Sequence, residues 1–166
     1  MAASSTLILM RHAAAAGGGR DEERPLTAGG QTAAAEAGEW IRAALPPVDA
    51  VLCSAAVRTR QTLAAMAIGA PTDYLDELYN GGVEDILEQV EEVAESAHTV
   101  LVIGHAPGIP ATAHQLVTNH GTAESPLVDE LRYFSAGAIA VVRFETPWRE
   151  LVHGGGELVT VRHPGQ

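Results

Sequence analysis

The sequence predicts one α/β domain over residues 1–166, arranged as a three-layer α-β-α sandwich around a mostly parallel sheet. Short apolar runs of strand length alternate along the chain with longer segments of helical periodicity, which is typical of strands joined by crossover helices. Hydrophobic residues make up 46% of the chain and charged residues 19%, as in globular proteins. A length of 166 residues is sufficient for a single hydrophobic core.

The first two elements are a strand and a long helix. Residues 6–10 form a short apolar run, and the Ala- and Gly-rich segment 13–23 that follows is typical of a loop. Thr27 is the expected N-cap of a helix that runs to about Leu45 and ends at Pro46-Pro47. Its core-facing stripe follows the i, i+3, i+4, i+7 pattern and consists of Ala33, Ala37, Trp40, Ile41, Ala44 and Leu45.

The middle of the chain repeats this alternation. Residues 50–53 predict a second strand, and Ser54 is the expected cap of a helix through Ala67. The clearest helix signal covers 83–97, where apolar residues fall on one face and acidic residues on the other, as on a solvated helix.

Residues 99–103 then predict a strand, and 109–118 a helix that tolerates Pro110 in its first turn. A loop is expected over 121–126. Two further strands are expected over 138–144 and 157–162, joined through Pro147 and three glycines and forming an antiparallel edge of the sheet.

Charge and cysteine content exclude several function classes. The net charge of −11 argues against nonspecific nucleic-acid binding and against docking on anionic membranes. Cys53 is the single cysteine, so no internal disulfide forms, and a reducing cytoplasm is the expected location. No apolar run is long enough to span a bilayer, and no signal peptide is evident. An anion site in this chain would therefore be a local cationic pocket.

Candidate catalytic residues follow two of the predicted strands. Arg11 and His12 come directly after the first strand, and His105 follows the strand over 99–103. Ligands bind beyond the carboxyl ends of such strands, so we expect one shared site. Imidazole can attack phosphorus, and a guanidinium can bind two phosphate oxygens. Arg58 lies in the first turn of the next predicted helix, near backbone N–H groups that also favour anions.

Each of these features has an unspecific alternative. Arg11-His12 alone is equally typical of a surface dipeptide, Arg58 of a solvent-facing helix residue, and His105 of a buried histidine bonded to backbone. A cysteine phosphatase is disfavoured, because only four residues separate Cys53 from Arg58, and Cys53 is expected to be a buried hydrophobe. A metal hydrolase is disfavoured as well, because no paired ligand spacing is found among His98, His114, His120, His153 and His163, which are expected to be surface or core residues.

Taken together, the features resemble the histidine phosphatase superfamily, whose members have the phosphoglycerate mutase-like fold. The resemblance rests on Arg11-His12-Ala13, on the segment Ser54 to Thr62 with Arg58 inside it, and on Gly104-His105. Within that family the chain is most similar to the short SixA-type phosphohistidine phosphatases. The segments that carry this closer likeness are Arg24-Pro25-Leu26-Thr27, His105-Ala106-Pro107-Gly108 and Phe134 to Ala140.

The resemblance implies a role for each matching residue. His12 would be the nucleophile that becomes phosphorylated, while Arg11, Arg58 and His105 would form the phosphate pocket. Arg24 would reach this pocket from its loop, or else anchor the start of the first long helix.

The general acid is less well defined by the resemblance. Glu77 matches the proton donor of one branch of the family, or is an exposed loop carboxylate. The chain departs from the other branch at Ala106, where that branch has an acidic residue. It also has Ala13 in place of a glycine, and the methyl group is harmless only if the local φ is negative.

The expected function is that of a metal-independent phosphatase with a covalent phosphohistidine intermediate, acting on protein phosphohistidine and needing no cofactor. One alternative is a small-molecule phosphomonoesterase of the same superfamily. Another is a non-catalytic phosphate-binding module. Mutase activity is disfavoured, since no long substrate-enclosing insertion is present. The expected partner is a phosphorylated protein or a small phosphate ester, and the sequence gives no indication of oligomeric state.

Overall fold

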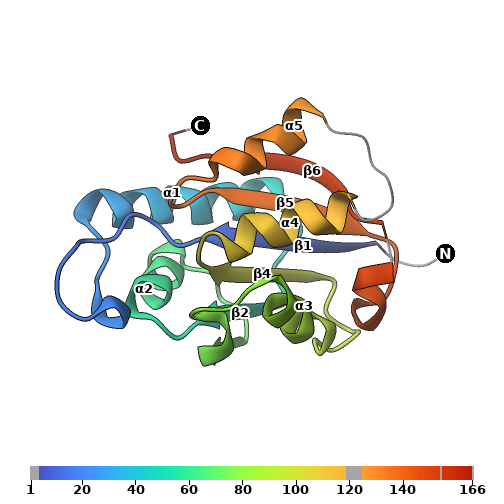
Figure 1. Cartoon of the computed structure of the whole chain (residues 1–166), viewed down its shortest axis with the longest axis horizontal. Helices are drawn as coiled ribbons and strands as arrows, with labels where there is room; N and C mark the ends of the chain where they lie inside the picture. Colours follow the sequence, from blue (N-terminus) through green and yellow to red (C-terminus); the bar gives the residue numbers. More distant parts are fainter. Residues whose placement is uncertain (1–3, 119–124, 154, 166) are drawn as a thin grey trace.

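Six strands form one sheet in the order β3-β2-β4-β1-β5-β6 (Figure 1). The computed structural model describes residues 4–118, 125–153 and 155–165. The strands are β1 (Ser5–Arg11), β2 (Ala50–Ser54), β3 (Thr72–Leu75), β4 (Thr99–Gly104), β5 (Ile139–Phe144) and β6 (Glu157–Arg162). The pairs β3–β2, β2–β4 and β4–β1 are parallel, whereas β5 and β6 are antiparallel to their neighbours. The predicted mostly parallel sheet with an antiparallel C-terminal edge is confirmed.

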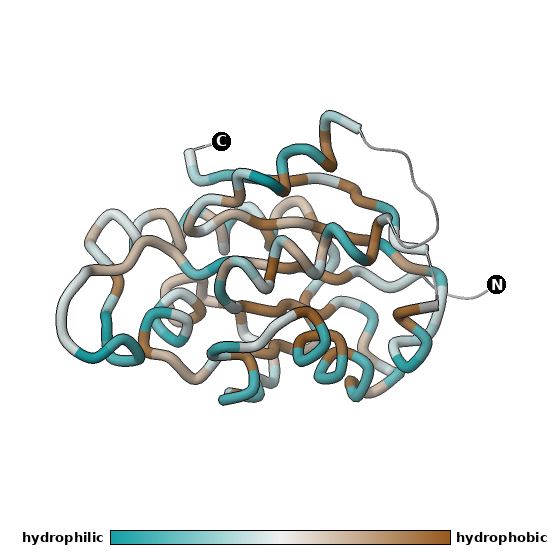
Figure 2. The backbone as a smooth tube through the Cα atoms, viewed as in Figure 1, coloured by the Kyte–Doolittle hydropathy of each residue, from teal (hydrophilic) through white to brown (hydrophobic). Residues whose placement is uncertain are grey.

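Central strand β1 is buried on both faces. Leu7 and Leu9 belong to one hydrophobic cluster, whereas Ile8 and Met10 belong to the other. Alternate side chains of a strand point to opposite faces, so a strand with a layer on each side must be apolar throughout. Figure 2 shows this concentration of hydrophobic residues along the central strands.

Two helical layers cover the sheet. The face of Ile8 and Met10 packs against α1 (Ala28–Ala44) and α2 (Val57–Met66), and the opposite face against α3 (Val83–Glu91) and α4 (Gly108–Thr118). The predicted three-layer sandwich is thereby confirmed. The shorter segments are α5 (Pro126–Asp129) and the 3-10 helices η1 (Asp21–Glu23), η2 (Asp76–Leu78), η3 (Glu130–Tyr133) and η4 (Trp148–His153). No helix in the described part of the chain has the length and apolarity that a bilayer crossing requires.

The long helix α1 begins where the sequence predicts. The hydroxyl of Thr27 accepts a hydrogen bond from the Gly30 N–H at 3.0 Å, which satisfies a free donor of the first turn. Its buried face is rotated from the predicted stripe, since Ala44 is exposed and Gly38 is buried. Gly38 lies against the backbone of Met66, so that α1 and α2 are in close contact.

Several predicted boundaries are wrong. Ser54 is the last residue of β2 and does not cap α2, whose N-cap is Ala56. Helix α3 ends at Glu91 instead of residue 97, because the chain turns there while Val93 and Ala97 still pack against the core. Apolar spacing alone does not distinguish a helix from a turn whose side chains reach the same core.

Other elements lie where the sequence predicts none. Strand β3 at the sheet edge is missing from the prediction, as is the 3-10 helix η4 between β5 and β6. Pro126 starts α5, although a loop is expected over 121–126. Residues 121–124 of that loop lie outside the described residues.

Candidate active site

The carboxyl ends of β1, β4 and β2 meet at one edge of the sheet. His12 directly follows β1 and His105 directly follows β4, and their ring centroids are 5.3 Å apart. The His12 N–H donates to the Gly104 carbonyl at 3.0 Å, which extends the β1–β4 pairing up to the histidine. The structure thus brings together the two histidines that the sequence placed at strand ends.

The His12 ring is held in one tautomer. Its Nδ1 lies 2.7 Å from the Ala13 carbonyl oxygen, which can only accept a hydrogen bond, so Nδ1 carries the proton. In the neutral ring Nε2 then keeps its lone pair. The pKa of His12 is lowered to about 4, mainly by burial and also by the charges of Arg58 and Arg11, against the opposing effect of the Ala13 hydrogen bond. At neutral pH the imidazole is therefore uncharged, and its free Nε2 could act as a nucleophile.

Ala13 fits at the position where the family motif has glycine. It is fully buried, and its N–H donates to the Thr62 hydroxyl at 3.0 Å. Among the described residues other than glycine, Ala67 is the one with positive φ, so the backbone at Ala13 is in an ordinary region. The methyl group therefore requires no strained conformation.

Three buried nitrogens at this site have no hydrogen-bond partner in the part of the chain that the structure describes. They are Nε of Arg11, Nε of Arg58 and Nδ1 of His105. Arg11 and Arg58 both lower the pKa of His12 by their charge, which shows their proximity to the nucleophile. Buried donors normally have partners, because an unpaired one loses its hydration without compensation. These three are suited to the oxygens of an anion.

Ser54 fixes the orientation of His105. The Ser54 hydroxyl oxygen lies 2.8 Å from Nε2 of His105 and accepts the Ala56 N–H at 3.4 Å. The hydroxyl can donate its proton to Nε2, which leaves the hydrogen on Nδ1, or accept from an Nε2–H through its second lone pair. The pKa of His105 falls to about 4 through burial and through the neighbouring His12 and Arg58. At neutral pH His105 is therefore uncharged, and its ring centroid lies 5.3 Å from that of His12.

Asp21 is a site residue that the sequence analysis missed. Arg58 donates from Nη1 to the Asp21 carbonyl at 2.7 Å and from Nη2 to its carboxylate at 3.1 Å. Tyr79 donates its hydroxyl to the same carboxylate, and Arg24 donates from Nε at 3.1 Å. The Tyr79 hydrogen bond, followed by Arg58 and Arg24, holds the pKa of Asp21 at about 2. The one local signal was the spacing of three between Asp21 and Arg24.

The two remaining predicted residues lie at different places. Arg24 donates from Nη1 to the Ala16 carbonyl at 3.3 Å and pairs with Asp21, so it ties the loop together, and its charge still reaches His12. Glu77 is exposed in η2, where its carboxylate accepts from Gln89 at 3.4 Å. The structure does not bring the Glu77 carboxylate to the cavity beside His105.

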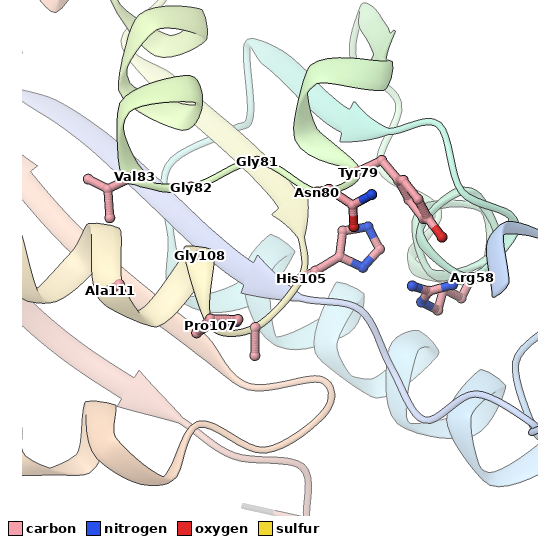
Figure 3. Close-up of a pocket in the computed structure, with 11 residues that line it drawn as sticks. Arg58, Tyr79, Asn80, Gly81, Gly82, Val83, His105, Pro107, Gly108 and Ala111 are labelled. Atoms are coloured by element: carbon pink, nitrogen blue, oxygen red, sulfur yellow. The ribbon is translucent and has the colours of Figure 1, made fainter.

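That cavity has a volume of about 360 Å³ and extends from the histidine site between η2 and the start of α4 (Figure 3). Figure 3 shows Arg58, Tyr79 and His105 at one end of it. Its remaining lining is uncharged and consists of Asn80, Gly81, Gly82, Val83, Ala106, Pro107, Gly108 and Ala111. Gly108 approaches the Gly81 carbonyl so closely that a Cβ atom would lie 2.6 Å from it. The cavity offers a neutral, narrow space beside a cationic centre.

Cys53 and the histidines outside the site bear on the alternatives of a cysteine nucleophile and a metal centre. Cys53 is buried as predicted, and burial raises the pKa of its thiol to about 12, so the reactive thiolate is disfavoured. Of the described residues, no three among His, Cys, Asp and Glu are grouped to hold a metal ion. His98 is exposed, and His114 and His163 are half-buried. His120 and the His153 side chain lie outside the described part.

Comparisons with known proteins agree with this geometry. The model of the histidine phosphatase superfamily (branch 1) matches residues 7–108. An uncharacterized protein of Mycobacterium tuberculosis is 40% identical over 141 residues, which cover 85% of this chain and 89% of that protein.

Solved structures show the same relationship. A candidate phosphohistidine phosphatase SixA from Nakamurella multipartitia is 51% identical with a TM-score of 0.94, covering 99% of each chain. The protein histidine phosphatase SixA complexed with tungstate is 25% identical with a TM-score of 0.77, covering 96% of this chain and 97% of its own. The fold is accordingly phosphoglycerate mutase-like, and the chain belongs to the histidine phosphatase superfamily.

Proposed function

We propose that the protein is a metal-independent phosphatase that forms a covalent phosphohistidine at His12 and acts on protein phosphohistidine. The observation that carries this proposal is a group of three buried nitrogens without a partner among the described residues, Nε of Arg11, Nε of Arg58 and Nδ1 of His105, beside a neutral histidine with a free Nε2. Such donors stabilise the charge that develops on phosphoryl oxygens in the transition state. The nucleophile and the anion pocket are thus supplied by the same strand ends.

The reaction has two displacements at phosphorus. Nε2 of His12 attacks the phosphorus and forms a P–N bond, while the bond to the leaving group breaks and its electron pair goes to the leaving atom, which takes up a proton. Water then attacks the same phosphorus, the P–N bond breaks, and its electron pair returns to Nε2. The water loses one proton to the medium or to an acid-base residue, and inorganic phosphate leaves with the remaining hydrogen on its new oxygen.

Glu77 stays the proposed proton donor on the family resemblance, although its exposed carboxylate is not part of the lining of the cavity beside His105. The leaving group of phosphohistidine is an imidazole, which needs less protonation than an alkoxide. Glu77→Gln should therefore slow hydrolysis of a phosphate ester more than that of phosphohistidine. Equal slowing of both substrates would contradict this assignment of the acid.

The comparisons support the proposed substrate. The Nakamurella relative is a candidate phosphohistidine phosphatase, and a second SixA forms a complex with tungstate, an oxyanion with the shape of phosphate. A small phosphate ester is the alternative substrate. We propose that the protein is located in the reducing cytoplasm, in keeping with its single buried cysteine.

The covalent intermediate is tested by labelling. The protein is incubated with the small phosphate donor phosphoramidate and analysed by intact mass. Wild type should gain one phosphoryl group that is lost in acid, and His12→Ala should gain none. The control His98→Ala removes an exposed histidine and should label like wild type. Oxyanion binding without labelling of wild type would instead identify a non-catalytic phosphate-binding module.

Turnover of a phosphohistidine-carrying protein, compared with a panel of small phosphomonoesters, tests the substrate. A kcat/KM at least about tenfold higher for the phosphoprotein is expected. A preference for one small ester would identify the protein as a phosphomonoesterase of the same mechanism.

A further inference from the structure

Asp21 is a carboxylate at the edge of an anion site, and the proposed chemistry does not account for it. With a pKa of about 2 it is ionised at neutral pH. An ionised carboxylate repels a bound phosphate, and the chain already has a net charge of −11. Another contribution of Asp21 must therefore offset its repulsion of a bound anion, and the hydrogen bonds of Asp21 indicate what that contribution is.

Those contacts occupy one end of the Arg58 guanidinium. This group has five N–H bonds in a rigid fork. Asp21 accepts from Nη1 through its backbone carbonyl and from Nη2 through its carboxylate, at 2.7 and 3.1 Å. The Nε–H, on another edge of the same plane, is buried and has no partner among the described residues. Fixing one end of the fork therefore fixes where the remaining N–H bonds point.

Asp21 is itself held from two sides. Arg24, three residues later in the same loop, donates to one carboxylate oxygen at 3.1 Å, and the Tyr79 hydroxyl donates to the other. The Tyr79 ring also meets the His105 ring edge-on at 5.6 Å and lies 5.8 Å from the Arg58 guanidinium carbon. The loop after β1, helix α2 and the segment after η2 therefore join at this one carboxylate.

We infer that Asp21 is a positioning residue, which orients the Arg58 guanidinium so that its free edge meets the phosphoryl group on His12. This inference rests on the proposed function and assigns a residue to it. Asp21 acts through Arg58 and does not contact the phosphate. The competing idea, that Asp21 occupies Arg58 as an autoinhibitory anion, predicts the opposite effect on turnover, because removing the carboxylate would then raise kcat.

The variants Asp21→Ala and Asp21→Asn test the inference, with Glu23→Ala as the matched control. Glu23 is exposed in the same short helix η1, so its removal changes the net charge equally without touching Arg58. Misplacement of a charge-assisted donor lowers kcat by about 10- to 100-fold, and we expect this for Asp21→Ala with KM changed by less than about threefold. Asp21→Asn keeps an oxygen that can accept from Nη2 and should recover part of kcat. Glu23→Ala should match wild type.

A second measurement does not depend on turnover. The Nε–H resonance of Arg58 in 15N NMR spectra should be sharp in wild type and broadened in Asp21→Ala. The backbone amide spectrum of the variant should show that the protein is still folded.

Two results would overturn the inference. One is a kcat of Asp21→Ala that lies within twofold of the wild-type value or exceeds it. A kcat above the wild-type value would indicate that Asp21 is autoinhibitory. The other is an Arg58 resonance that stays sharp without the carboxylate. Absence of turnover in wild type would refute the proposed function alone, since the NMR result would still test the Asp21–Arg58 coupling.

Discussion

Burial of His12 and His105 makes the stability of the fold depend on pH. Each has a pKa of about 4 in the folded protein, below the ordinary value of 6.5, with burial as the main cause. Between pH 6.5 and 4 the unfolded chain therefore binds protons that the folded protein does not. The contribution of the two neutral histidines to the free energy of unfolding is therefore complete above pH 6.5 and decreases as the pH falls toward 4.

We expect His12→Asn to weaken this dependence. Urea unfolding at pH 7.5 and at pH 4.5 should show that the free energy of unfolding drops by about 2 kcal/mol less in the variant than in wild type, since one protonation site is removed. The value at pH 7.5, where both histidines are neutral in both states, serves as the reference for each protein. Equal losses in the two proteins would show that His12 titrates normally in the folded state.

At the residue scale, sequence reasoning found the groups that follow strand ends and missed those that act across the fold. Arg11, His12 and His105 can be placed because the carboxyl ends of parallel strands share an edge. The pairing of Asp21 with Arg58 spans 37 positions, and with Tyr79 58 positions, so no local pattern reveals it. Ser54 was recognised as a polar residue at a strand–helix junction, but it binds His105 instead of capping the helix.

Helices α1 and α2 pack with their backbones in contact at Gly38. A Cβ atom added there would lie 2.1 Å from the Met66 carbonyl oxygen, and Arg42 donates a hydrogen bond to the same oxygen. Backbone atoms cannot yield as a side chain does, so a methyl group must separate the two helices. Because α2 carries Arg58, the spacing of these helices also bears on the site.

We expect Gly38→Ala to destabilise the protein by about 2 kcal/mol or more, despite the better helix propensity of alanine. The matched control is Gly29→Ala in the same helix, where the nearest atom is the Thr27 hydroxyl at 3.9 Å. This control should be neutral or more stable by up to about 1 kcal/mol. Urea unfolding measures both, and equal stability of the two variants would contradict the close packing described for α1 and α2.

At the element scale, the accuracy of the sequence prediction depended on burial. Strand β1 and the start of α1 could be predicted from a buried apolar run and a cap at Thr27. Edge strand β3 could not, because two of its four residues are exposed and it lacks a clear apolar pattern. The predicted α3 is too long, because the residues after Glu91 keep the apolar spacing of a helix while the backbone turns.

For the whole molecule, the negative net charge opposes the local charge of the site. An anionic ligand meets a chain of net charge −11 before it reaches Arg11, Arg58 and Arg24. Long-range repulsion is screened by salt, with a Debye length of about 30 Å at 0.01 M and about 8 Å at 0.15 M. The attraction between the pocket arginines and the ligand acts over shorter distances, so salt weakens this attraction less than it weakens the long-range repulsion.

We therefore expect kcat/KM for a small dianionic phosphate ester to rise about two- to fivefold between these salt concentrations. For a phosphohistidine in a lysine-rich peptide, the same salt change should lower kcat/KM. Measurements in both chloride and acetate salts separate screening from competition by one anion. A fall with salt for the small ester would show that the cationic pocket, and not the net charge, governs the encounter.

The layer arrangement of the whole molecule could be predicted, whereas the order of its strands could not. Alternating strands and helices predict a covered parallel sheet, but many strand orders satisfy that pattern. The position of β1 between β4 and β5 follows from contacts between residues that are about 90 to 140 positions apart, such as Thr6 with Thr99 and Ser5 with Phe144.

The backbone of His12 is hydrogen-bonded on both sides, to Gly104 at the end of β4 and to Gly137 just before β5. A ribosome must therefore release most of the polypeptide before the imidazole can adopt its reactive pose. A nascent or C-terminally shortened chain would carry the histidine without its chemistry. Under the proposed function, phosphoryl transfer would therefore require a chain that is synthesised and folded at least as far as β5.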